Sequence, residues 1–393
     1  MIHAQYLMET KKNFGFIDTI RCISMMGIVF EHSIVTMYHQ KLSDTVLNIL
    51  FFQIFKFVTI AFFIIGGFLI NHKFQEYTPA QYLKNRLKNT ILPWIFWIAI
   101  LIAIKAIYLM YAHGKPGNHM PLPSAGNFLL HEVINSVFFT SFWFIPNFLI
   151  CISILLIFKK ILYKVWFGIL LFAISSIYSI NIYKQWFIPG HTTALFGFVF
   201  YLWLGVFMNR HYEKVAKFVD DTSFNRLIFI NLFLYSLAAG EAFYIFSIGY
   251  PEIGNTLRIT NVLYSLAMFV TLLKVGKITW LTNHIQPRQT TFGIYLVHFM
   301  LTIYLTGLFF KPFHIIYENL NAYQVIGLSL MRFLLVYLTS LFIVKAIIKT
   351  KFKWSVGMKS DKEPEQPITN SVDQNALEIE NSRLMNQNGY HTY

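Results

Sequence analysis

The sequence predicts an all-α protein that crosses the membrane many times. Hydrophobic residues make up 56% of the 393 residues, aromatic residues 18% and charged residues only 13%. A soluble domain has roughly 25% charged residues. The mean hydropathy is +0.52. These values exclude a soluble globular protein and indicate a bundle of transmembrane helices.

Ten apolar segments are long enough, or nearly so, to cross a hydrocarbon core of about 30 Å. They lie near residues 15–37, 49–72, 90–111, 142–158, 161–180, 192–208, 226–247, 256–274, 290–310 and 322–348. An even number of spans places both termini on the same side of the membrane.

Lys and Arg residues collect in every second connection, which is the pattern of cytoplasmic loops. The connection after the second segment includes Lys84, Arg86 and Lys88, whereas the next one holds only Lys115. We therefore expect about ten spans with both termini in the cytoplasm. The net charge of +14 then reflects membrane topology, and no nucleic-acid partner is expected.

Three regions follow from this pattern. Residues 1–13 form a polar cytoplasmic segment without the pattern of a cleaved signal peptide, and residues 14–350 form the membrane domain. Residues 351–393 are rich in polar residues and are expected to be a disordered cytoplasmic tail. The longest outer loop, 112–141, contains several Gly and Pro residues and is predicted to be irregular.

The first apolar segment carries three side chains able to do chemistry: Asp18, Arg21 and His32. Eleven residues separate Arg21 from His32, and eleven helical steps make three full turns plus about 20°, so both point from the same face. They lie roughly 16 Å apart along the helix. Ionisable groups inside a span are costly and usually functional.

Each of these residues also has a structural interpretation. A lone Arg near the end of a span is commonly an anchor whose head group reaches the interface, and a lone His is commonly satisfied by a neighbouring helix. If the pair is functional, Arg21 would meet an anionic donor at the cytoplasmic end. Asp18 would orient Arg21, and His32 would take a proton from a hydroxyl.

The chain resembles the acyltransferase-3 superfamily, bacterial membrane enzymes that move acyl groups from acyl-CoA to sugars of exported glycans and glycolipids. The first match is Asp18-x-x-Arg21 followed by His32. Further matches occur in family order, at Ala61–Leu69, at Lys84–Asn89 leading to Pro93-Trp94, at Phe142–Pro146, and at Thr291–His298 with its Tyr295.

The resemblance implies a reaction and a set of site residues. His32 would be the catalytic base, in direct transfer or through a covalent acyl-histidine, with Arg21 and Asp18 beside it. Donor and acceptor would be bound by Lys84, Arg86, Lys88, Trp143, Tyr295 and His298. Acyl-CoA, most simply acetyl-CoA, is the co-substrate, and the resemblance implies neither a cofactor nor a metal. The location implied is the bacterial inner membrane.

Three positions depart from the family pattern. Gly66 stands where Ser is usual, Asn89 where Arg is frequent, and Phe142 where a polar or aliphatic residue usually precedes Trp143. None of them changes Arg21 or His32.

A transporter or glycan export channel is the alternative from another class. Ionisable residues at Glu31, Lys56, Glu241 and Arg332 also fall inside predicted spans and would suit a permeation path. However, the two halves show no matching pair of Gly/Pro-broken spans. A third alternative is an inactive relative with a sensor role, which the presence of both Arg21 and His32 argues against.

Overall fold

The protein is all-helical throughout the residues that its computed structural model describes, which are 14–35, 42–76, 78–114, 123–190, 194–250 and 252–358. This confirms the predicted fold class. Both the predicted N-terminal segment, 1–13, and the tail from residue 359 onward lie outside the described residues.

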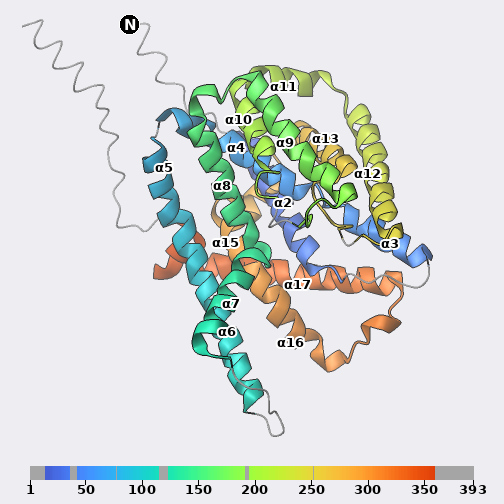
Figure 1. The fold of residues 1–393 in the computed structure, drawn as a ribbon. Coiled ribbons are helices and arrows are strands. Elements are labelled where there is room, and N and C mark those ends of the chain that lie inside the picture. The colour runs from blue at the N-terminus through green and yellow to red at the C-terminus, as the bar shows by residue number, and fades with distance from the viewer. Residues whose placement is uncertain are drawn as a thin grey trace, which may run out of the picture. The chain divides into compact units, whose positions relative to one another are not determined.

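The helices follow one another with short connections (Figure 1). The α-helices are α2 (Gly15–Ser33), α3 (Leu42–Gln53), α4 (Val58–Glu76), α5 (Pro79–Arg86), α6 (Leu92–His113), α7 (Ala125–Phe138), α8 (Phe144–Ile157), α9 (Val165–Lys184), α10 (Val199–Arg210), α11 (Tyr212–Asp221), α12 (Phe224–Ser247), α13 (Ile259–Val275), α14 (Thr279–Ile285), α15 (Pro287–Met300), α16 (Thr306–Phe310) and α17 (Ala322–Ile348). Two π-helical turns, η1 (Leu87–Ile91) and η4 (Leu301–Leu305), continue α5 and α15, and short 3₁₀ turns include η2 (Ser141–Trp143) and η7 (Lys351–Val356).

Within the described residues, six helices are long and apolar enough to cross a membrane, and up to eight if each of two bent helix pairs is counted as one span. All ten predicted segments coincide with helices. Two of the ten segments do not qualify as candidate membrane spans by length and composition. They form α2, which carries three charged residues, and α10, which has only 12 residues. The protein is a multi-pass membrane protein, and the orientation of its termini stays a prediction.

The prediction of an irregular outer loop over 112–141 was wrong for its second half. There α7 forms over Ala125–Phe138 and meets η2 and α8 at 67°. Its first turn is capped by Ser124, whose hydroxyl accepts from the backbone N–H of Asn127. The Gly and Pro residues that suggested a loop lie almost entirely before this cap, and an apolar run follows it.

The helix α2 lies at the centre of the bundle, packed against α4, α15 and α17 (Figure 1). Thirteen of its 19 residues are buried. The buried polar side chains of α2 must therefore find their partners among other protein groups.

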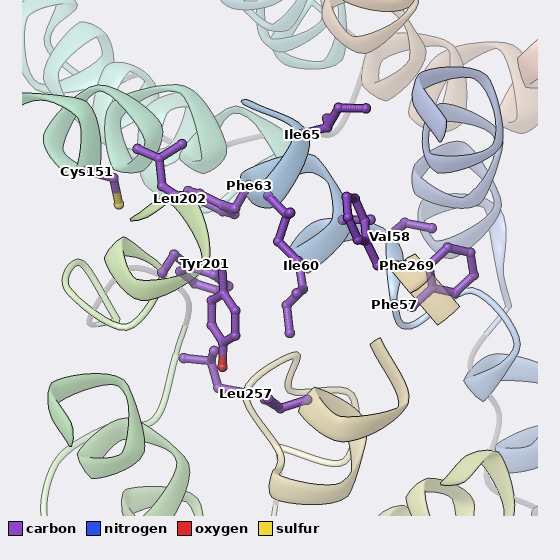
Figure 2. Packing of buried hydrophobic residues seen from close by; sticks show 14 of the residues in the cluster. Phe57, Val58, Ile60, Phe63, Ile65, Cys151, Tyr201, Leu202, Leu257 and Phe269 are labelled. Atoms are coloured by element: carbon purple, nitrogen blue, oxygen red, sulfur yellow. The ribbon is translucent and has the colours of Figure 1, made fainter. Parts of the chain in front are cut away.

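The closest backbone approach is between α4 and α10. A Cβ atom on Gly67 would lie 1.8 Å from the carbonyl oxygen of Leu202, and one on Gly205 would lie 1.9 Å from that of Ile64. Small residues allow membrane helices to pack this tightly. Around them, Phe63 and Ile60 of α4 meet Tyr201 and Leu202 of α10 in the main apolar core (Figure 2).

A break separates α3 from α4 at residues 54–57. Non-helical backbone at membrane depth is tolerated where it is buried in protein and its polar groups are satisfied. The tyrosine hydroxyls of α12 and α13 meet this need, because Tyr235 donates to the Leu50 carbonyl at 2.6 Å and Tyr264 to the Ile54 carbonyl at 2.9 Å.

The folded unit extends to Met358. The short helix η7 packs on α6, α15 and α17. The indole N–H of Trp97 on α6 donates to the carbonyl of Ser355 at 2.8 Å, and Ser355 and Val356 are buried. Residues just after the predicted boundary at 350 therefore belong to the membrane domain.

We predict that Gly205→Ala destabilises the protein by about 1–3 kcal/mol, because the added methyl group overpacks the α4–α10 contact. Gly240→Ala on α12 is the matched control, since a Cβ atom there meets nothing within 4 Å. Thermal unfolding in detergent should show a lower melting temperature for Gly205→Ala and an equal or higher one for Gly240→Ala. Equal melting temperatures for the two variants would contradict the close packing.

Candidate active site

The residues predicted to do chemistry lie in two groups along α2. Asp18 and Arg21 are near its first turn, and His32 is in its last. No Pro residue or π-helical turn interrupts α2, so its regular helical spacing keeps Arg21 and His32 on one face. Their positions along α2 place the two groups roughly 16 Å apart.

The first group is an arginine cluster of Arg21, Arg86 and Arg288, in which Arg21 and Arg288 contact Asp18 and Arg86 lies within electrostatic range of Arg21. The Nε of Arg288 donates to both oxygens of Asp18, at 3.0 and 2.9 Å. Arg21 lies 3.8 Å from the same carboxylate and within electrostatic range of Arg288 and Arg86. Three guanidinium groups against one carboxylate leave this end of α2 strongly positive, which suits an anionic ligand.

Arg86 is held in place by its own helix. Its Nε donates to the Tyr82 hydroxyl at 2.8 Å, and its guanidinium lies 5.2 Å from the centre of the Tyr82 ring. Tyr82 is buried, so Arg86 is positioned by a rigid neighbour. Lys84 and Lys88, predicted with Arg86 to bind the donor, are exposed on either side of it.

The second group is a histidine pair. The ring of His298 on α15 lies 5.3 Å, centre to centre, from the ring of His32. His298 is completely buried, and its Nδ1 is 2.7 Å from the Tyr295 carbonyl. A carbonyl only accepts, so Nδ1 carries the proton and Nε2 carries a lone pair. This Nε2 is buried and has no hydrogen-bond partner among the described residues.

Tyr295 supports the histidine pair. Its hydroxyl donates to the Ser141 carbonyl at 2.5 Å, which ties α15 to the turn η2 between α7 and α8. Its ring lies 5.9 Å from that of His298. The structure therefore places Tyr295 next to His298, with its hydroxyl bonded to the backbone of η2.

Trp143 lies in an aromatic layer between α8 and α10. Its ring is 6.1 Å from that of Phe144 and 5.6 Å from that of Phe198. The packing also explains why position 66 is Gly where the family pattern usually has Ser. A Cβ atom there would lie 2.6 Å from the Phe148 ring, so Phe148 occupies the space that a Ser would need.

Three of the four other ionisable residues predicted inside the bundle form ion pairs. Lys56, at the break between α3 and α4, donates to Glu31 at 2.9 Å. Glu241 lies 3.9 Å from Arg258, which is fully buried and donates to the Ala238 carbonyl and to Gln53. Arg332 forms no ion pair with any described residue. These contacts join helices to one another, and Glu31 also lies within electrostatic range of Arg258.

Arg288 is the site residue that sequence reasoning did not single out. In the sequence it is one of several basic residues in a predicted cytoplasmic connection, with no motif that marks it. In the structure it occupies the second position of α15, after Pro287 and the left-handed Gln286. Because its partner Asp18 lies 270 residues earlier in the chain, no local spacing pattern reveals the contact.

Both π-helical turns in the described part of the chain adjoin site residues. The turn η1 begins one residue after Arg86, and η4 begins three residues after His298. The hydroxyl of Thr302 donates to the His298 carbonyl at 2.9 Å. Such wider turns occur often at functional sites.

The comparisons with known proteins agree with this geometry. Residues 14–347 match the family model described as Acyltransferase domain, of the acyltransferase-3 type. No curated protein and no solved structure matches the chain significantly. The match covers most of the chain, including both groups on α2, and so the chain belongs to the acyltransferase-3 family and is a multi-pass membrane acyltransferase.

Proposed function

We propose that the protein is an acyl-CoA-dependent O-acyltransferase of the bacterial inner membrane. It would transfer an acyl group, most simply acetyl, to a hydroxyl of a cell-surface polysaccharide or lipid-linked sugar. The observation that carries the proposal is that an arginine cluster and a histidine pair lie at the two ends of one helix, α2, which contributes Arg21 and His32 to them.

The donor fits this arrangement from end to end. Acyl-CoA has phosphates at one end and a reactive thioester at the other, joined by the pantetheine arm. The arginine cluster supplies charge-assisted hydrogen bonds for the phosphates. The separation of roughly 16 Å along α2 leaves room for an extended arm, which would bring the thioester towards His32. Lys84 and Lys88, exposed beside Arg86, add positive charge that attracts the donor.

The histidine pair supports general base catalysis. His32 would take the proton from the acceptor hydroxyl as its oxygen attacks the thioester carbonyl, which forms the ester bond and breaks the C–S bond. The proton then passes from His32 to the leaving CoA thiolate. His298 would orient His32 by offering the lone pair of Nε2 to the imidazole N–H.

A transport function has less support. The buried charges, Glu31 with Lys56 and Glu241 with Arg258, join neighbouring helices. The family match is to an acyltransferase, and no observation on the described residues links these charges to a transported solute.

Replacement of His32 with Ala should lower acyl transfer at least 100-fold, because general base catalysis contributes roughly 10²–10⁴ to the rate. Release of CoA from acetyl-CoA by the purified protein, supplied with a glycolipid extract as acceptor, measures this. His113→Ala is the matched control, because His113 is exposed at the end of α6. Wild-type activity in His32→Ala, with normal expression and folding, would rule out the proposed base.

Replacement of Arg288 with Ala should raise the KM for acetyl-CoA about tenfold, the effect of one lost charge-assisted contact of roughly 1.5 kcal/mol. Arg288→Lys should restore part of this loss, because Lys keeps the positive charge but not the planar guanidinium that can bind a phosphate through two N–H groups. Arg226→Ala, an exposed arginine at the start of α12, serves as the control. An unchanged KM in Arg288→Ala would exclude Arg288 from donor binding.

A further inference from the structure

We propose that the cavity between α6, α7 and η4 binds sugar units of the acceptor. The inference rests on the proposed function and adds the place where the acceptor is held. The cavity has a volume of about 360 Å³. It is lined mainly by aromatic and charged side chains, namely Lys105 and Tyr108 of α6, Phe128, His131 and Glu132 of α7, and Tyr304 of η4.

The lining has the chemistry that a sugar requires. Aromatic rings pack against the C–H faces of a pyranose, and the polar tips of Tyr and His bond its hydroxyls. Lys105 donates to Glu132 at 2.5 Å, so a donor and an acceptor lie side by side. A carboxylate has about four lone-pair sites, so Glu132 retains the capacity to accept from sugar hydroxyls.

The cavity is accessible in the structure as it stands. The side chain of Tyr108 is 68% exposed and that of His131 72% exposed. Glu132 is only 13% exposed, and its charge lies within electrostatic range of Tyr304. The ion pair is therefore more enclosed than the two rings, which lie at the surface of the helical unit.

The cavity and the histidine pair are connected through α15, which η4 continues. Arg288 stands at the start of α15, His298 near its end and Tyr304 in the following π-turn. Six residues separate His298 from Tyr304, or roughly 9 Å along a helix. The helix thus carries a donor contact, a catalytic-site histidine and a cavity residue in that order. The cavity also lies at the ends of α6 and α7 that the charge pattern predicts to face outward, where exported glycans are found.

The larger cavity of the described structure has a different character. It measures about 800 Å³ and is lined mostly by apolar side chains, such as Phe207, Val219 and Phe269, together with Tyr163, His211 and Lys214. Such a lining suits hydrocarbon and offers few partners for hydroxyl groups. The smaller cavity is favoured for the sugar because Glu132 and Lys105 line it, whereas the described lining residues of the larger cavity include no carboxylate.

Two exposed tyrosines of the same helix provide a matched test. Tyr108 is 68% exposed and lines the cavity, whereas Tyr111 is 66% exposed and does not. Neither substitution removes core packing, so both Tyr108→Ala and Tyr111→Ala should fold. The assay follows transfer from radiolabelled acetyl-CoA to a glycolipid extract from cells that lack the gene.

For Tyr108→Ala we expect the KM for the extract to rise about fivefold or more, equivalent to roughly 1 kcal/mol, with the KM for acetyl-CoA changed less than twofold. Glu132→Gln, which keeps the volume of the side chain, should raise the same KM. Tyr111→Ala should match the wild type in both values.

Three other outcomes overturn the inference. Equal acceptor KM values for Tyr108→Ala, Glu132→Gln and wild type would show that the cavity does not bind the acceptor. A parallel rise in both KM values for Tyr108→Ala would show a general structural effect. If the wild-type protein neither labels the extract nor releases CoA, the proposed function itself fails, and the inference falls with it.

Discussion

The loss of water around the charged side chains of α2 is the constraint on which the rest of the structure depends. Asp18, Arg21 and Glu31 lie on a helix packed against α4, α15 and α17. A charge removed from water is stable only when it is paired. Arg288 of α15 forms an ion pair with Asp18, and Lys56 at the break between α3 and α4 forms one with Glu31. Packing of α15 against α2 supplies Arg288 for this ion pair and also brings His298 next to His32.

The break between α3 and α4 illustrates how this constraint propagates. Lys56 reaches Glu31 from a turn whose released carbonyls would be unsatisfied in lipid. Tyr235 and Tyr264 donate to two of those carbonyls, and Arg258 and Gln53 bond to each other nearby. One ion pair on α2 therefore depends on side chains from α3, α12 and α13, and polar groups far apart in the chain stabilise a single arrangement.

Helix periodicity and hydropathy were sufficient to predict the helical membrane fold and the shared face of Arg21 and His32. They could not identify Arg288, since its contact with Asp18 joins residues 270 positions apart. They also missed α7, because Gly and Pro residues just before Ser124 masked a helix start. The rings of His32 and His298 meet because α2 packs against α15, and a pattern within one sequence does not predict such a contact between distant helices.

The central claim is that α2 holds the phosphates of acyl-CoA at one end and the reacting thioester at the other. Comparison of acetyl-CoA with acetyl-pantetheine, which lacks the phosphates, tests it most directly when it is made in both the wild-type protein and Arg21→Ala. The account predicts that the wild type prefers acetyl-CoA in kcat/KM and that most of this preference disappears in Arg21→Ala, because the lost contact is the one that recognises phosphate. An equal preference in the two proteins would contradict it.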